Sequence, residues 1–281
     1  MEIAEHLNLE SRIQRYMDLS KFLHLLETSQ IFLSKISSFD DKLEGGLTRL
    51  DAFMLSGAAD LLDFMVNRSF PSLRHMDEKE RDEYQKENNR IQKEIDAKKL
   101  STVFGEFDRN ECSDVYKFQR DWLDVCCWHK NEQESMAMWK IYGAGTNSLC
   151  IETTVQSLID SVSVDDGCEI YLSDVEYIDH EVDNFQRQHQ LSPYLHKSKF
   201  YTFEQEVRLI KYQPKSDIRS CRVDPGSHLN VDLNKLIKVV RVSPEAPEWF
   251  FNLIRDIVKY RYNLNADVIY SRMKKEPIFD L

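Results

Sequence analysis

The chain has 281 residues, of which 42% are hydrophobic and 30% are charged, a composition typical of a soluble globular protein. Its formal net charge of −11 disfavours a nonspecific nucleic-acid binder, because binding to phosphates needs a concentrated basic surface. The chain has only eight glycines and no GxxxxGK[ST], GxGxxG, HExxH or GxSxG motif, which excludes typical P-loop ATPases, kinases, zinc proteases and α/β-hydrolases.

Targeting and redox features predict a cytoplasmic protein. No apolar run reaches the roughly 20 residues that a membrane-spanning helix needs. The N-terminal residues 1–16 lack the basic and apolar regions of a signal peptide. The six cysteines show no CxxC spacing and no pairing with nearby histidines. We therefore expect reduced thiols, no metal site and no membrane partner.

The first half of the chain is predicted to be mostly helical. Residues 20–30 place apolar side chains at helical spacing behind Ser20, which can serve as the N-cap. Residues 31–41 alternate and predict a short strand that runs into a turn. Residues 47–67 carry dense helical apolar periodicity, which predicts a buried helix.

Residues 77–99 differ from the rest of the chain in mixing charges of both signs with a narrow apolar stripe. Pairs such as Arg90 and Glu94, four residues apart, support a helix. No Gly/Pro/Ser-rich linker flanks the segment. We therefore predict a solvent-exposed helix inserted within a single domain that spans residues 1–281. The alternative is an arm that binds a protein partner.

The second half is predicted to be rich in strands. Runs of β-branched and aromatic residues lie at 148–155, 168–178, 204–212, 227–233, 237–244 and 266–273. An amphipathic helix is predicted at 247–264. Consecutive strands with few intervening helices indicate an α+β fold with a mainly antiparallel sheet core, a helical N-terminal half and a charged surface helix.

Three clusters of polar residues are candidates for a functional site, and the first contains Arg15, Tyr16 and Lys21. Strand alternation places Arg15 on an apolar face. An arginine buried without a partner is costly, so Arg15 must meet an anion from the protein or from a ligand. A structural ion pair, to Asp18 or Glu44, and a ligand-binding role both remain open.

The second cluster joins aromatic and polar side chains. Glu134 and Tyr142 are spaced to line one side of a short helix that also carries Trp139. The strand that follows ends in Thr153 and Thr154. Aromatic side chains beside polar groups suit a planar ligand, although Trp and Tyr also fill protein cores.

The third cluster is FYTFEQEVRLIK, residues 200–211, which follows the basic run HKSK. Read as a strand, it places Glu204, Glu206 and Arg208 on one face. The two carboxylates would lie roughly 6.5–7 Å apart along the strand. Their repulsion raises the pKa of one unless a cation compensates, and Arg208 is placed to do so. A solvated strand face and a catalytic pair both fit this pattern.

Together these clusters resemble a bacterial family catalogued as domain of unknown function 2971. The resemblance rests on RYMDLSKFLHLLETSQIFLSKISSFDDKLEG, on CWHKNEQESMAMWKIYG followed by CIETTV, on HKSKFYTFEQEVRLI, and on the closing KVVRVSP and VIYSRM. It covers most of the chain apart from residues 77–99. The activity of that family is unassigned, so the resemblance implies positions rather than a reaction.

The order of the clusters is also similar, more distantly, to that in the ADP-ribosyltransferase fold. That fold carries an arginine on an early strand, a Ser/Thr motif on a middle strand and a Glu-x-Glu near the later strands. Arg15, then Thr153 and Thr154, then Glu204 and Glu206 stand in this order. The chain departs from the pattern because its middle motif lacks the Ser-Thr-Ser form, and Arg15 is matched by order alone.

This likeness implies that NAD is the substrate and that no metal is needed. Glu206 stabilises the oxocarbenium character that develops as the nicotinamide–ribose bond breaks. Glu204 orients or deprotonates the acceptor, and Arg15 clamps the pyrophosphate. We group Tyr16 and Arg208 with the residues that bind NAD.

The same likeness implies supporting roles for the second cluster. Thr153 or Thr154 supports Glu206 by hydrogen bonding, and Tyr142 or Trp139 stacks on the nicotinamide.

We therefore expect an NAD-consuming enzyme of the ADP-ribosyltransferase or NAD glycohydrolase type, acting as a toxin or phage-defence effector. Its acceptor is a protein, a nucleic acid, a small molecule or water. One alternative is a non-enzymatic sensor or interaction module. Another is a nucleic-acid-processing defence effector.

Overall fold

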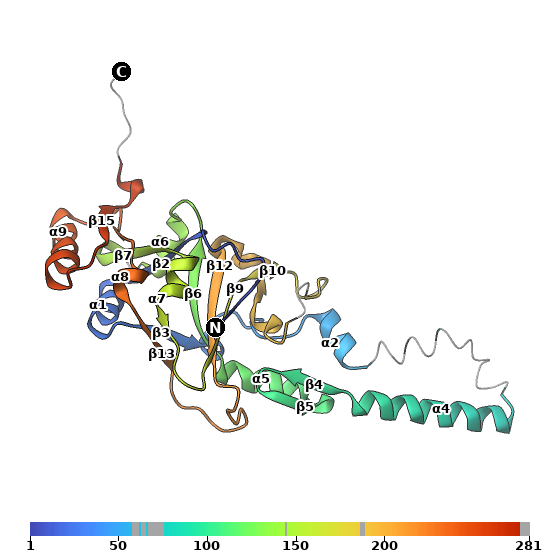
Figure 1. Ribbon diagram of the computed structural model, residues 1–281. Coiled ribbons are helices and arrows are strands. Elements are labelled where there is room, and N and C mark those ends of the chain that lie inside the picture. The colour runs from blue at the N-terminus through green and yellow to red at the C-terminus, as the bar shows by residue number, and fades with distance from the viewer. Residues whose placement is uncertain (58–61, 63–65, 67–75, 144, 186–188, 276–281) are drawn as a thin grey trace, which may run out of the picture.

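The computed structural model describes residues 1–57, 62, 66, 76–143, 145–185 and 189–275 (Figure 1). Within these residues the largest sheet contains 11 strands. Eight of them follow one another across the sheet in the order β1 (Glu2–Ile3), β9 (Glu169–Asp174), β12 (Glu206–Tyr212), β6 (Asp124–Lys130), β2 (Arg12–Asp18), β7 (Ser148–Thr154), β14 (Val239–Val242) and β15 (Asp267–Tyr270).

The other strands of this sheet extend from β6. Strand β3 (Gln30–Lys35) pairs with β6, β13 (Gly226–Val231) pairs with β3, and β8 (Val162–Ser163) pairs with β13. Two small sheets lie apart from it, formed by β10 (Glu176–Ile178) with β11 (His196–Ser198) and by β4 (Lys99–Thr102) with β5 (Gly105–Asp108).

The α-helices connect and cover these strands. They are α1 (Leu19–Thr28), α2 (Arg49–Leu55), α4 (Glu78–Ala97), α5 (Cys112–Trp122), α6 (Met136–Tyr142), α7 (Val155–Ser161), α8 (Leu233–Leu236) and α9 (Glu248–Asp256). Buried side chains from five of them, Phe22 of α1, Val115 of α5, Leu158 of α7, Leu236 of α8 and Phe250 of α9, belong to one hydrophobic core with the sheet. No helix within the described ranges is both long and apolar enough to span a membrane.

The sheet is mixed, so the prediction of a mainly antiparallel core is wrong. Strand β1 is parallel to β9, and β14 is parallel to β15, at the two ends of the sheet. The chain passes from β14 through α9 to β15. Such a crossover returns the chain in the same direction and gives a parallel pair. The strand–helix–strand pattern was present in the sequence, but the preceding run of strands favoured an antiparallel interpretation.

The prediction of a helical N-terminal half is also wrong. Strands β2, β3 and β6 all come from the first 130 residues and lie in the middle of the sheet. Strand β6 reads DVCCWHK and has no alternation of apolar and polar residues. Five of its seven residues are buried, because the strand has neighbours on both edges and is covered on both faces. A strand buried in this way lacks the period-two pattern by which strands are recognised.

Two helices differ from their predicted form. Helix α1 begins at Leu19, and its N-cap is Asp18 rather than Ser20, since the Asp18 carboxylate accepts the Lys21 amide hydrogen. Helix α2 covers only seven of the residues at 47–67, and none of its side chains is buried. The predicted buried helix is therefore wrong for residues 47–57, and most of the remainder lies outside the described residues.

Helix α4 occupies most of the charged segment and extends away from the sheet (Figure 1). Asp77 and Glu80 form a capping box at its start, and most of its side chains are exposed. The interpretation of this segment as an insertion within one domain, residues 1–281, stays a prediction.

Strand β6 changes its partner along its length, and this positions the candidate site. Near its C-terminal end His129 lies opposite Gln14 of β2, whereas near its N-terminal end Val125 lies opposite Ser34 of β3. Residues 126–128 lie between these two registers. Strands β2 and β3 therefore diverge beside the middle of β6, and the sheet is split there.

Candidate functional site

A cavity of about 880 Å³ lies at the divergence of β2 and β3. Its walls come from both strands, from the middle of β6, from α6 and from the 3₁₀ helix η5 (Lys199–Glu204). Of the nine site residues predicted from the sequence, five line this cavity: Arg15, Tyr16, Tyr142, Glu204 and Glu206. The four that are not part of its wall are Trp139, Thr153, Thr154 and Arg208.

Glu204 and Glu206 do not lie on one strand, so that prediction is wrong. Glu204 is the last residue of η5, and β12 begins at Glu206. Between them Gln205 adopts the left-handed conformation, with φ 42° and ψ 55°. This tight turn replaces strand alternation, and it brings both carboxylates to the same cation. All seven residues of β12 are buried, which also excludes a solvated strand face.

Lys197 of β11 supplies that cation. Its Nζ lies 2.5 Å from Oε2 of Glu204 and 3.0 Å from Oε1 of Glu206. The side chains of all three residues are at most 7% exposed. The ammonium also lies 4.6 Å from the centre of the Tyr201 ring. A single buried cation therefore holds the two carboxylates together.

Arg208 lies behind Glu206 rather than on the cavity wall. Its Nε and Nη2 atoms are 2.7 Å and 2.6 Å from Oε2 of Glu206, as expected for residues two apart on one strand face. Its Nη1 donates to the Tyr194 carbonyl at 2.7 Å, and Nη2 also forms an ion pair with Glu44. The predicted compensation of Glu206 by Arg208 is therefore present, but Arg208 is fully buried and does not reach a ligand.

This network separates the pKa values of the two carboxyls. Burial, followed by hydrogen bonding to Glu206 and its charge, raises the pKa of Glu204 to about 7. Burial acts on Glu206 in the same direction, but the Arg208 guanidinium, the bond to Glu204 and the Lys197 ammonium together hold its pKa well below the usual range. Glu206 is thus ionised at neutral pH, whereas Glu204 gains and loses its proton there.

The position of Glu204 is held by two further groups. The Tyr142 hydroxyl donates to Oε1 of Glu204 at 2.9 Å, and Nδ1 of His129 lies 2.5 Å from the Glu204 carbonyl oxygen. That short contact requires the proton of His129 to be on Nδ1. Burial lowers the pKa of His129, which keeps the ring neutral. Tyr142 lies on the cavity wall and is 41% exposed, so it is accessible to a ligand.

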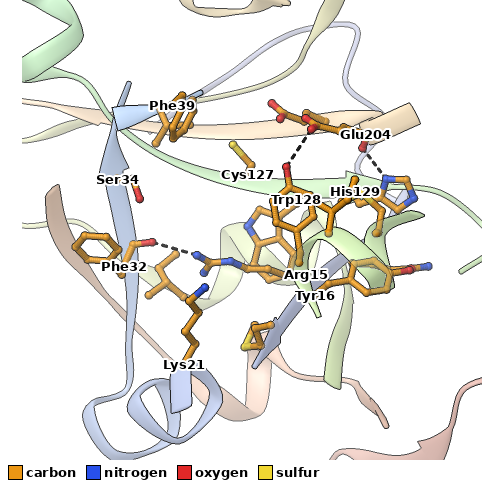
Figure 2. Close-up of a pocket in the computed structure, with 18 of the residues that line it drawn as sticks. Arg15, Tyr16, Lys21, Phe32, Ser34, Phe39, Cys127, Trp128, His129 and Glu204 are labelled. Atoms are coloured by element: carbon orange, nitrogen blue, oxygen red, sulfur yellow. Dashed lines mark hydrogen bonds between the residues drawn. The ribbon is translucent and has the colours of Figure 1, made fainter. Parts of the chain in front are cut away.

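Arg15 faces the cavity from β2. Its Nη2 donates to the Phe32 carbonyl of β3 at 3.2 Å, across the split in the sheet (Figure 2). Within the part of the chain that the structure describes, Arg15 forms no ion pair. The two carboxylates proposed from the sequence are engaged elsewhere, Asp18 at the start of α1 and Glu44 with Arg208. The predicted structural ion pair of Arg15 with Asp18 or Glu44 is therefore wrong.

The cavity has sides of opposite character. Arg15 and Lys21 lie on one side and Glu204 on the other (Figure 2). Arg15 on β2 and Glu206 on β12 are separated by β6, which corresponds to two strand spacings, or roughly 10 Å. The described residues contain no group of three or more His, Cys, Asp or Glu side chains placed to hold a metal ion.

Tyr16 and Trp139 pack mainly against one another. Their rings meet edge to face with centroids 4.9 Å apart, and they share a small buried cluster with Met138 and Cys150. The Trp139 indole donates to Glu134 at 3.2 Å. Trp139 is 4% exposed and is not positioned to stack on a ligand in the cavity.

Thr153 and Thr154 lie on β7, which is separated from β12 by β6 and β2. The Thr154 hydroxyl caps α7 by accepting the Ser157 amide hydrogen at 3.1 Å, and the Thr153 hydroxyl is buried without a hydrogen-bond partner. Neither residue supports Glu206. The backbone amide of Glu206 donates instead to the Tyr177 hydroxyl at 2.9 Å.

Sequence reasoning missed the roles of two residues, Lys197 and His129. Lys197 was noticed only as part of a basic run beside the glutamates, and its contact with both carboxylates depends on the left-handed turn at Gln205 between them. His129 contacts Glu204 because β6 is the neighbour of β12, with His129 directly opposite Glu206. Strand pairing of this kind has no local signal in the sequence.

Comparisons with known proteins give little further information. No family model and no curated protein matches this chain, so the resemblance to domain of unknown function 2971 has no support from them. Among solved structures, the chain is similar to Thermus sp. 2.9 DarT in complex with ADP-ribosylated ssDNA, with 8% sequence identity and a TM-score of 0.38 over 98% of each chain.

Proposed function

We propose that this protein binds NAD in the cavity between β2 and β3 and cleaves its nicotinamide–ribose bond, as an ADP-ribosyltransferase or NAD glycohydrolase. One observation carries the proposal. Arg15, which has no carboxylate partner among the described residues, and the Glu204–Lys197–Glu206 group face the same cavity from opposite sides of β6.

The charges of the cavity match those of NAD. The group around Glu206 contains one more carboxylate than cations when all are ionised, since three glutamates face one lysine and one arginine: Glu44, Glu204, Glu206, Lys197 and Arg208. Glu204 loses its proton as the pH rises through about 7, and this side then favours the positively charged nicotinamide ring. Arg15 and Lys21 favour the pyrophosphate on the other side, where Arg15 can form paired hydrogen bonds to phosphate oxygens.

The size and lining of the cavity also fit. Its volume of about 880 Å³ lies within the usual range of ligand pockets. Aromatic side chains of Phe39, Trp128 and Tyr142 contribute to its wall. Tyr142 is the one of these that also touches Glu204, so it is placed to pack against a nicotinamide bound beside the carboxylates.

Bond cleavage depends on Glu206. As the C1′–N bond breaks, its electron pair leaves with nicotinamide, and positive charge develops on the ribose. The ionised Glu206 stabilises this charge and accepts a hydrogen bond from the ribose 2′-hydroxyl. Lys197 and Arg208 each hold one oxygen of Glu206, so the carboxylate does not have to reorient during the reaction.

The second half of the reaction depends on Glu204. A pKa of about 7 lets this carboxyl accept a proton from the attacking nucleophile near neutral pH. With water as the nucleophile the products are nicotinamide and ADP-ribose. With a hydroxyl, amine or amide acceptor, the ADP-ribosyl group is transferred to it instead. In both cases the released proton passes to Glu204.

The test is incubation of the purified protein with NAD and measurement of released nicotinamide. We expect Glu206→Gln to lower the rate about 100-fold or more, because it removes the charge at nearly constant size. Glu10→Gln, an exposed residue outside the cavity, is the matched control and keeps full activity. Circular dichroism and thermal unfolding verify that both variants are folded.

Two outcomes contradict the proposal in different ways. If the wild-type protein releases no nicotinamide, alone or with cell extract, yet binds NAD, it acts as a non-enzymatic sensor. If it neither binds nor cleaves NAD, the cavity has another ligand.

A further inference from the structure

A second hollow lies at the carboxyl ends of the parallel strands β14 and β15. Its volume is about 390 Å³, and its lining residues are Arg241, Ile269, Tyr270, Ser271, Arg272, Lys274 and Lys275. Four of these seven side chains are cationic and none is acidic. Such a concentration of positive charge is unusual in a chain with a net charge of −11.

The base of the hollow is the buried Arg241 of β14. Its Nε donates to Oε2 of Glu152 at 2.9 Å, and Nη1 lies 3.5 Å from Oε1 of Glu134. That oxygen already accepts the Arg272 amide hydrogen at 2.8 Å. Nη1 is buried and makes no hydrogen bond, although the Glu134 carboxylate lies within ion-pair distance. Two carboxylates therefore fix the guanidinium in place without satisfying all of its donors.

The other cations follow directly after β15. Arg272 and Lys275 form no ion pair within the described part of the chain. The Lys274 ammonium donates to the Ala246 carbonyl and lies 4.0 Å from the centre of the Tyr270 ring. The short helix η7 (Arg272–Lys274) holds them together, with the Ser271 hydroxyl accepting the Met273 amide hydrogen at 3.2 Å. Positive side chains without carboxylates to neutralise them favour an anion.

The position in the fold supports a ligand site. Strands β14 and β15 are a parallel pair joined by α9, and the register places Arg241 beside Ile269. In sheets with parallel strands connected by helices, ligands bind outside the carboxyl ends of the strands. The hollow is at this edge, and none of its lining residues lines the cavity proposed for NAD.

We propose that this hollow binds a small phosphate-bearing anion, such as pyrophosphate or a mononucleotide, between Arg241 at its base and the cations of Arg272 and Lys275. Arginine suits this ligand because its planar guanidinium can donate two parallel hydrogen bonds to phosphate oxygens. The cations converge on one hollow rather than forming a stripe along the surface, which favours a small molecule over a nucleic-acid backbone.

The experiment is titration of the full chain with inorganic phosphate, pyrophosphate or AMP, followed by calorimetry and by NMR of the Ser271 and Arg272 amides. We expect pyrophosphate or AMP to bind and to shift these amides. In the double variant Arg272→Gln, Lys275→Gln, the dissociation constant of pyrophosphate or AMP should rise about tenfold or more, since charged hydrogen bonds are lost. The control, Lys215→Gln with Lys238→Gln, removes the same charge from exposed positions elsewhere and leaves binding unchanged.

A third variant separates this hollow from the first cavity. Arg15→Gln should leave the shift of the Ser271 amide intact. Loss of pyrophosphate binding in Arg15→Gln, but not in the Arg272/Lys275 variant, places the anion in the first cavity and overturns the proposal. Absence of binding at millimolar ligand overturns it as well. The proposal is also overturned if the Lys215/Lys238 control weakens binding as much as the Arg272/Lys275 variant does. Tighter binding of a single-stranded oligonucleotide than of pyrophosphate and AMP overturns it too.

Discussion

Lys197 and Glu206 form a buried ion pair, with Nζ of the lysine 3.0 Å from Oε1 of the glutamate. The same ammonium lies 2.5 Å from Glu204, so one cation lies between both carboxylates of the Glu-x-Glu motif. Charges in such a site are screened poorly because little water reaches them. The stability of the fold and the chemistry proposed for the cavity therefore depend on the same three side chains.

Replacing Lys197 with methionine should be strongly destabilising. The change keeps most of the length of the side chain but removes the cation shared by the two buried carboxylates, so that Glu204 loses its ion pair and Glu206 keeps only Arg208. Breaking a buried pair in this way costs about 3–5 kcal/mol. Urea unfolding measures the loss. Lys199→Met is the control, because its ion pair with Asp183 is on the surface, where such pairs contribute little to stability. Equal losses in the two variants would contradict a special role for Lys197.

The rate of NAD cleavage should depend on the ionisation of Glu204. Burial and the neighbouring Glu206 raise the pKa of Glu204 to about 7, so its base form becomes available as the pH rises through that value. We expect kcat/KM to increase with pH, with a midpoint near pH 7. The measurement is nicotinamide release across this range. Glu204→Gln should be slow at every pH and should lack the midpoint, and a variant that keeps the midpoint would exclude Glu204 as its source.

The same pKa shift predicts how stability changes with pH. The pKa of Glu204 in the folded protein lies above its ordinary value of 4.5, so folding favours the protonated form. Its contribution is fully present below pH 4.5 and is lost as the pH rises through about 7. Between these limits the wild-type protein should lose on the order of 2–3 kcal/mol that Glu204→Gln does not lose. Chemical denaturation at several pH values measures the difference.

Glu206 provides a control for that experiment, because its contribution to stability changes with pH in the opposite direction. Its pKa is lowered by Arg208, Glu204 and Lys197 against the effect of burial, so its contribution is present above pH 4.5 and is lost as the pH falls toward the lowered value. Glu206→Gln should therefore reduce the dependence of stability on pH in acid, not near neutrality. The reverse result would mean that the two pKa values are exchanged.

Arg15→Gln should weaken NAD binding with little effect on folding. Arg15 contributes a hydrogen bond to the Phe32 carbonyl but no ion pair within the described residues, so the fold loses little without its charge. Loss of paired hydrogen bonds to the pyrophosphate should raise KM about tenfold or more. Arg12→Gln on the same strand is the control, because Arg12 pairs with Glu152 and lies outside the cavity. A comparable rise in KM for Arg12→Gln would argue against a local role for Arg15.

Thr154→Ala should lower the stability of the fold but leave the KM for NAD unchanged. The substitution removes the N-cap of α7, which costs about 1 kcal/mol. Thr153→Val should be neutral or stabilising, because the Thr153 hydroxyl is buried without a hydrogen bond. Thermal unfolding and KM for NAD test both variants. A rise in KM in either one would restore the role that the resemblance implied for these threonines.

Local features were predictable from the sequence. The apolar spacing of residues 20–30 predicted α1, and alternation predicted β3, because the burial of these two elements follows the period of the backbone. Strand β12 is buried at all seven positions and was predicted from its β-branched and aromatic residues instead. Strand β6 is also buried on both faces, but its sequence DVCCWHK has neither the alternation nor a comparable run of such residues. The predicted length and burial of α2 were also wrong, because apolar periodicity does not show whether a partner surface exists.

The sequence by itself determined which polar residues had to be accounted for, among them Arg15, Glu204 and Glu206. Only the tertiary structure decided how they are combined. The left-handed turn at Gln205 and the pairing of β12 with β6 bring the glutamates to Lys197, and the divergence of β2 and β3 leaves Arg15 facing a cavity. The physical reason is that backbone periodicity acts over a few residues, whereas ion pairs and cavities depend on which distant strands meet and in which register.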